Sequence, residues 1–174
     1  PETIPLVLDF LTTTESSVIV HNALFDIRKI NWETKKHVKN VIDTQLIWAT
    51  ILNHVDTFNA KVGLKGLAGK IYGKWSVTDL FGIENKYNPD LIEYSGIDAI
   101  ATYFLYQDAL HHPEFQWLKG ESKIPIDQVL PIHHPSDLAN RQSRRFFYEN
   151  VVTPLIKPMI TMMNNGITLD MDKV

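Results

Sequence analysis

The sequence contains no cysteine among its 174 residues. This absence excludes disulfide bonds, thiolate zinc sites and cysteine nucleophiles together. The sequence also lacks an apolar run close to the roughly 20 residues that span a membrane, and no signal-peptide pattern opens it. We therefore expect no membrane partner.

Positive charge is in short supply as well. The 17 lysine and arginine residues stand against 20 aspartate and glutamate residues, which gives a formal net charge of -3. A protein of this charge does not coat nucleic acid through bulk electrostatics, although an enzyme can still bind a strand locally around metal ions. The apolar share of 44% is typical of a globular protein.

Short β-branched runs alternate with helical patterns over the first 112 residues. Residues 17–20 and 38–42 predict two strands, because they are rich in valine and isoleucine. Apolar residues recur at helical spacing near 5–11, 25–30, 45–52, 64–73 and 88–111. The alternation predicts an α/β layer structure for residues 1–112.

The remaining residues predict a linker and a helical extension. Four prolines interrupt residues 113–135, which we interpret as the linker. A helical segment is predicted from Ser136 to about Asn165, interrupted by Pro154 and Pro158 and stopped by Gly166. Residues 136–174 therefore form the predicted extension, with a short strand at 167–170.

Two segments carry polar and acidic residues of the types that bind ligands or take part in catalysis. In the first, the strand at 17–20 ends in a polar pair that includes Asn22, and Asp26 follows one helical turn later. In the second, Tyr94 and Asp98 share one face of the long helix. Strand ends that lead into helices are where α/β proteins place ligand chemistry. Structural roles also fit: Asn22 as a helix cap, Asp26 facing the helix dipole, and Tyr94 with Asp98 as a surface pair.

The order and spacing of these segments resemble the 3′→5′ exonuclease domain of family A DNA polymerases, within the DEDD exonucleases of ribonuclease H-like fold. His-Asn-x-x-Phe-Asp at 21–26 resembles the second exonuclease motif of that family, and Tyr-x-x-x-Asp at 94–98 resembles the third, in its tyrosine version. Asp43-Thr44 resembles the helix start between them. Residues 147–170 are similar to the segment that leads into the polymerase domain.

The resemblance implies proofreading by two-metal phosphodiester hydrolysis at a DNA 3′ end. Asp26 and Asp98 would bind Mg²⁺ or Mn²⁺, for which carboxylate oxygens are suitable ligands. Tyr94 would orient the attacking water, and Asn22 would help to hold the strand terminus. Lys65 would meet a phosphate, or would be an ordinary solvated lysine. The implied partners are a single-stranded DNA 3′ end, primer-template DNA and the rest of a polymerase, in cis or as a separate chain, in the cytoplasm of a bacterial or phage-infected cell.

The family's first motif, Asp-x-Glu on the opening strand, does not match residues 9–11. We therefore expect an N-terminally incomplete exonuclease fold, taken from a longer polypeptide, that on its own binds metal weakly and hydrolyses DNA poorly. Two alternatives stay open: a stand-alone exoribonuclease of the ribonuclease D type, and a nuclease-dead scaffold domain.

Several other features favour structural roles. We expect the tryptophans at 32, 48, 75 and 117 in the core or at its boundary rather than as base-stacking platforms. Arg144 and Arg145 are expected on a solvated helix face. The histidine pairs at 111–112 and 133–134 lack the spacing of metal ligands on a helix.

Overall fold

A short parallel sheet lies at the centre of the fold. The computed structural model describes residues 3–52, 62–71, 89–121, 123 and 143–166. Strand β1 (Val18–Val20) pairs in parallel with β2 (Val41–Asp43), and Val20 stands opposite Asp43 at the carboxyl end of the pair. Helix α2 (Ala23–Thr34) makes the connection between them, as a parallel pair requires.

Both faces of the sheet are covered. Val18, Val20 and Val41 pack with one hydrophobic cluster, built around α2 and the C-terminal helix. Ile42, which points to the other face, packs with a second cluster. This arrangement explains the uninterrupted β-branched run in the half-buried strand β1, because a parallel strand that is covered on both faces favours apolar residues at every position.

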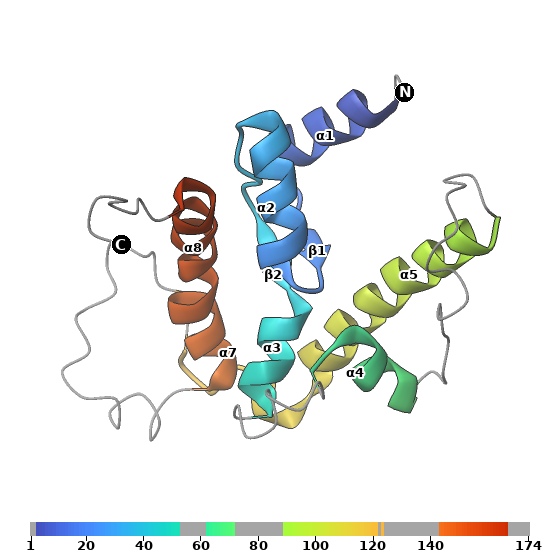
Figure 1. Cartoon of the computed structure of the whole chain (residues 1–174). Coiled ribbons are helices and arrows are strands. Elements are labelled where there is room, and N and C mark those ends of the chain that lie inside the picture. Colours follow the sequence, from blue (N-terminus) through green and yellow to red (C-terminus); the bar gives the residue numbers. More distant parts are fainter. Residues whose placement is uncertain (1–2, 53–61, 72–88, 122, 124–142, 167–174) are drawn as a thin grey trace, which may run out of the picture.

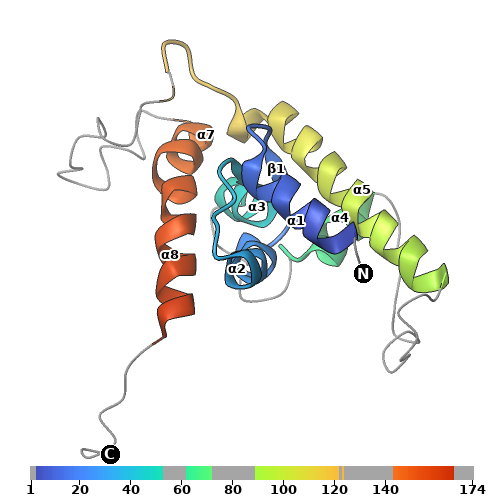
Figure 2. The same ribbon diagram turned by 90° about the horizontal axis from the view of Figure 1, so that it is seen from above.

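Helices surround the sheet on both sides. They are α1 (Thr3–Thr13), α3 (Thr44–Ile51), α4 (Leu64–Ile71), α5 (Pro89–His111) and α8 (Thr153–Asn165). Figures 1 and 2 show α8 and α5 on opposite sides of a central group made of α2, α3 and the sheet. Helix α8 packs against α2, whereas α5 packs against β1, α3 and α4.

The start of the predicted linker packs onto this core. A short 3₁₀ helix, η3 (Pro113–Phe115), places the Phe115 ring among the core residues, where it is 2% exposed and meets Tyr148 edge to face at 5.7 Å between ring centroids. The side chain of His112 caps this helix by accepting a hydrogen bond from the Glu114 amide. Residues 124–135 of the predicted linker lie outside the described part of the chain.

The C-terminal helical segment continues through its prolines. It consists of α7 (Arg144–Phe147), the π-helical turn η5 (Tyr148–Val152) and α8. A proline ring clashes with the carbonyl four residues before it, and the wider π turn gives Pro154 the room it needs. The predicted interruption at Pro158 is wrong, because α8 runs past it to Asn165, where Gly166 ends the helix at φ 68° as predicted.

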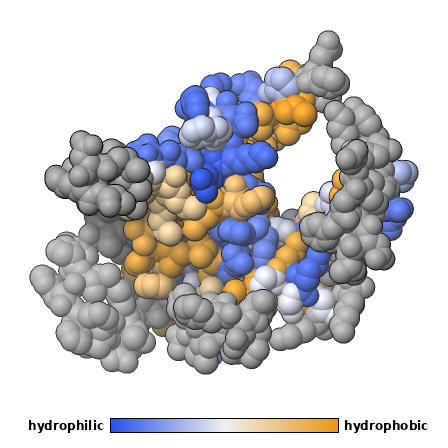
Figure 3. All heavy atoms as spheres, viewed as in Figure 1, coloured by the Kyte–Doolittle hydropathy of each residue, from blue (hydrophilic) through white to orange (hydrophobic). Residues whose placement is uncertain are grey.

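Most predicted elements within the described residues are confirmed, with the second strand shorter than expected and ending at Asp43. The predicted strand at 167–170, the helix start at Ser136, Trp75 and the histidines at 133–134 lie outside the described residues. No helix in the described part of the chain has both the length and the apolar character of a membrane span. Exposed apolar side chains do occur on α1, and Figure 3 shows them as an orange patch beside the hydrophilic surface of α2.

Candidate active site at the carboxyl end of the sheet

Asp43 is the centre of the site. Its side chain is 1% exposed and accepts four backbone hydrogen bonds. Two come from the amides of Gln45 (2.9 Å) and Leu46 (3.3 Å) at the start of α3, and two from the amides of Asn22 (3.2 Å) and Ala23 (2.7 Å) at the start of α2. One carboxylate therefore caps two helices, whose N-terminal amides and dipoles favour a negative charge there.

The turn between β1 and α2 depends on Asn22. This residue adopts a left-handed conformation (φ 78°, ψ 66°), which asparagine tolerates better than most non-glycine residues. It occupies the N-cap position of α2, but its side chain makes no capping bond. The interpretation of Asn22 as the chemical cap is therefore wrong, since Asp43 supplies the acceptor and leaves the Asn22 side chain exposed.

His21 links the ends of three segments. Its Nδ1 lies 2.8 Å from the hydroxyl of Thr44, and its Nε2 lies 3.0 Å from the carbonyl oxygen of Val62. Burial lowers the pKa of His21 below its ordinary value, and the negative charges of Asp43 and Asp98 oppose this shift only in part. Both ring nitrogens are engaged in these contacts, so His21 positions the strand end and is a poor candidate for a metal ligand.

Tyr148 closes the far side of the site. Its hydroxyl accepts a hydrogen bond from the Asp43 amide at 2.9 Å and donates one to the Asp43 carbonyl at 3.3 Å. Burial raises the pKa of Tyr148 well above its ordinary value. The hydroxyl therefore stays protonated and fastens the C-terminal helical segment to the strand end.

Asp26 lies in the first turn of α2, close to Asp43. Partial burial raises the pKa of Asp26 above its ordinary value, and the negative charge of Asp43 raises it further. The neighbouring carboxyl groups of Asp26 and Asp43 form an electrostatic environment that attracts a cation. Asp26 is the member of this pair that faces solvent, because Asp43 is buried under the backbone amides.

Tyr94 and Asp98 lie together on α5, as their spacing predicts. Lys65 of α4 contacts both of them: its ammonium group forms an ion pair with Asp98 and lies 4.0 Å from the centroid of the Tyr94 ring. Asp98 also lies near enough to His21 for its charge to affect that ring. Asp98 on α5 and Asp26 on α2 are thus each near a residue of the strand ends, Asp98 near His21 and Asp26 near Asp43.

The donor set fits a divalent ion only in part. Among the described residues, no three histidine, aspartate or glutamate side chains are arranged to hold a metal ion. Asp43 and His21 are engaged in structural hydrogen bonds, which leaves the carboxylates of Asp26 and Asp98. Mg²⁺ usually takes one or two carboxylates and completes its shell with water and substrate phosphates.

Two predictions about side chains near the site need correction. Trp32 was expected in the core or at its boundary, but it lies on the surface of α2 and is 57% exposed. Arg144 and Arg145 were expected on a solvated face, but Arg144 contacts the Ile51 carbonyl and pairs with Glu114, and Arg145 pairs with Glu149. Trp48, in contrast, is buried as predicted.

The double cap by Asp43 and the tie from Tyr148 were not predicted from the sequence. The Asp43-Thr44 pair marks the start of α3, but nothing local indicates that the same carboxylate reaches α2. That contact follows from the parallel pairing, which places Val20 beside Asp43 and so brings the next residues of both strands together.

Comparison of the chain with protein-family models gives no match, and comparisons with curated proteins and with solved structures give none either.

Proposed function

We propose that this chain is the 3′→5′ exonuclease region of a family A DNA polymerase, with a ribonuclease H-like fold and a helical extension toward the polymerase domain. The observations that support the proposal most directly are the positions of Asp26 near Asp43 and of Asp98 near His21, at the carboxyl end of a parallel sheet. Ligand chemistry in open α/β sheets is located at this end. The motif order supports the same reading.

In the proposed reaction, a water oxygen attacks the terminal phosphodiester phosphorus. The bond from phosphorus to the 3′ oxygen of the preceding nucleotide breaks, which releases a nucleoside 5′-monophosphate and leaves a new 3′-hydroxyl group. Divalent ions bound with the substrate would polarise the phosphate and lower the pKa of a bound water. Asp26 and Asp98 are the proposed ligands of those ions, and the hydroxyl of Tyr94 is proposed to orient the water.

Lys65 has a defined place in this scheme. Its ammonium group forms an ion pair with Asp98 and lies against the Tyr94 ring. When a phosphate and a metal ion enter, the lysine can transfer its contact from the carboxylate to a phosphate oxygen. It would then serve as the phosphate contact, and Asn22 at the end of β1 is the residue proposed to help hold the strand terminus.

The test is stepwise shortening of a 5′-labelled single-stranded DNA oligonucleotide by the protein, with Mg²⁺ or Mn²⁺. We expect Asp98→Asn and Asp26→Asn to reduce the rate by at least 100-fold, while Asp9→Asn, an exposed carboxylate on α1, leaves it unchanged. An intact 3′ end in the presence of both metals would contradict the proposal and favour a nuclease-dead scaffold. Degradation of RNA but not DNA would favour the ribonuclease D type.

A further inference from the structure

A groove with an aromatic floor runs along α2, away from the proposed active site. Phe25 and Trp32, 69% and 57% exposed, lie seven residues apart on one face of the helix, which corresponds to about 10 Å along its axis. A hollow of about 380 Å³ separates them and is lined by both aromatic rings together with Arg28, Lys29 and Asn164. Phe25 directly precedes Asp26, so the groove begins beside the site.

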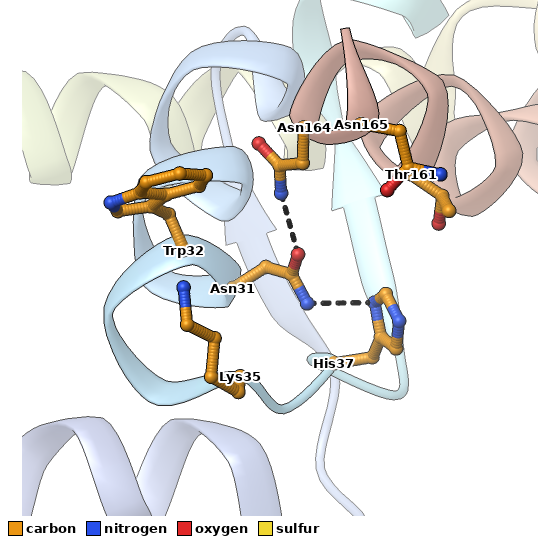
Figure 4. Close-up of a pocket in the computed structure, with 7 residues that line it drawn as sticks. All are labelled: Asn31, Trp32, Lys35, His37, Thr161, Asn164 and Asn165. Atoms are coloured by element: carbon orange, nitrogen blue, oxygen red, sulfur yellow. Dashed lines mark hydrogen bonds between the residues drawn. The ribbon is translucent and has the colours of Figure 1, made fainter.

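A second hollow continues the groove past Trp32. It has a volume of about 280 Å³, and Figure 4 shows its lining: Trp32 and Lys35 on one side, Asn31 and His37 at its base, and the polar end of α8 on the other side. The Lys35 ammonium lies 4.1 Å from the centroid of the Trp32 ring. Trp32 and Asn164 line both hollows, which makes the two parts one continuous surface.

The groove is lined by cationic side chains and by side-chain amides. Arg28, Lys29 and Lys35 lie along it, against the single carboxylate of Glu33, and none of the three cations forms an ion pair within the described part of the chain. The side chains of Asn31 and Asn164 are hydrogen bonded to each other at 2.6 Å, which holds α2 and α8 together and fixes the floor.

We propose that the groove lined by Phe25, Arg28, Lys29, Trp32, Lys35 and Asn164 binds single-stranded nucleic acid upstream of the reacting 3′ end. Exposed aromatic rings between cations are the usual construction of a single-strand track, because every base has a face to stack and every nucleotide carries a phosphate. The separation of the two residues along the helix axis, about 10 Å, is close to three steps of a stacked strand at about 3.4 Å each. The local excess of positive charge, on a chain whose net charge is -3, favours a polyanion over an apolar protein partner.

The inference rests on the proposed function for the direction of the strand, but binding can be measured without cleavage. We would record the fluorescence anisotropy of a 5′-fluorescein-labelled oligo(dT) of 12 nucleotides in EDTA, over a series of salt concentrations. Trp32→Ala should weaken binding by at least about fivefold, and Trp32→Phe should retain much of the affinity, since phenylalanine also stacks. Lys29→Ala should lower the slope of log Kd against log salt by about 0.7.

Matched controls lie on α5 and after η3. Tyr103→Ala removes an aromatic ring that is 50% exposed, and Lys119→Ala removes an exposed cation; neither should change the affinity. Equal losses for Trp32→Ala and Tyr103→Ala, or no binding of the oligonucleotide by the unsubstituted chain at low salt, would overturn the proposal. Trp32-dependent binding without nuclease activity would support the groove and contradict the proposed function. Cleavage that is insensitive to Trp32→Ala, with unchanged affinity, would support the proposed function and contradict the groove.

Discussion

Replacement of Asp43 by asparagine is the most informative single perturbation of this fold. The substitution preserves size and shape but removes the charge and replaces one carboxylate oxygen by an NH₂ group. That group would face amide donors, because both oxygens of Asp43 accept backbone hydrogen bonds at the starts of α2 and α3. Whichever way the new amide turns, at least one buried N–H loses its acceptor.

The expected cost follows from these contacts. A buried donor without a partner costs about 1–3 kcal/mol. Loss of the negative charge at each of two helix N-termini costs a further 0.3–1 kcal/mol or so. We therefore expect Asp43→Asn to lower the free energy of unfolding by about 2–4 kcal/mol, a large share of the 5–15 kcal/mol that is typical of a domain. For a chain of this length, Tm should fall by about 5–15 °C.

Urea unfolding followed by far-ultraviolet circular dichroism measures the effect. The control is Asp26→Asn, which makes the same chemical change at an exposed position in the first turn of α2 and should shift stability by no more than about 0.5 kcal/mol. If Asp43→Asn is no more destabilising than Asp26→Asn, the double cap does not hold the strand end together and the description of the site is wrong.

Two further predictions concern the same strand end. Because burial lowers the pKa of His21, the stability that the neutral ring contributes is complete above the ordinary value of 6.5 and is lost as the pH falls through the lower folded value. The urea midpoint of the His21→Asn variant should therefore change less than that of the original protein between pH 7.5 and pH 5. A difference between the two midpoints that stays constant across that range would contradict the assignment. Asn22 has a positive φ, so Asn22→Gly should keep the urea midpoint within about 0.5 kcal/mol of the original protein, whereas Asn22→Val should destabilise by about 1–2 kcal/mol; equal midpoints for the glycine and valine variants would exclude backbone strain at this turn.

Local patterns were sufficient to predict most of the described elements. The β-branched run at 18–20 predicts a strand, which the structure forms with its residues half-buried, and Pro89 followed by Asp90 marks the start of α5. Gly166 ends α8 because its positive φ suits a residue without a side chain. In each case the signal and the structure that it specifies lie within a few residues of each other.

Contacts between distant segments were not predictable in the same way. Trp32 is large and apolar, as core residues usually are, but it lies on the exposed face of α2. Only the packing of α2 on the strands decides which face of the helix is exposed. Tyr148 is 105 residues from Asp43, and no local pattern announces their hydrogen bonds. The candidate site falls between these cases. The pairing of Tyr94 with Asp98 on one helix was predictable, but the positions of Asp26 and Asp98 relative to the strand ends were not.

The titratable residues at the strand ends fall into two groups, one with structural contacts and one with proposed catalytic roles. Asp43 and His21 are committed to holding α2, α3 and the residue at 62, and their substitution should act on stability first. Asp26 and Asp98 lie at the edge of that rigid centre, where a change in charge alters the site without removing a buried acceptor. The proposal therefore requires a separation of effects: substitutions at Asp26 and Asp98 should alter metal-dependent activity with little change in stability, and substitutions at Asp43 should destabilise the fold. If all three positions lowered stability alike, the two proposed ligands would be structural residues, and the chemistry assigned to this end of the sheet would have no residues to perform it.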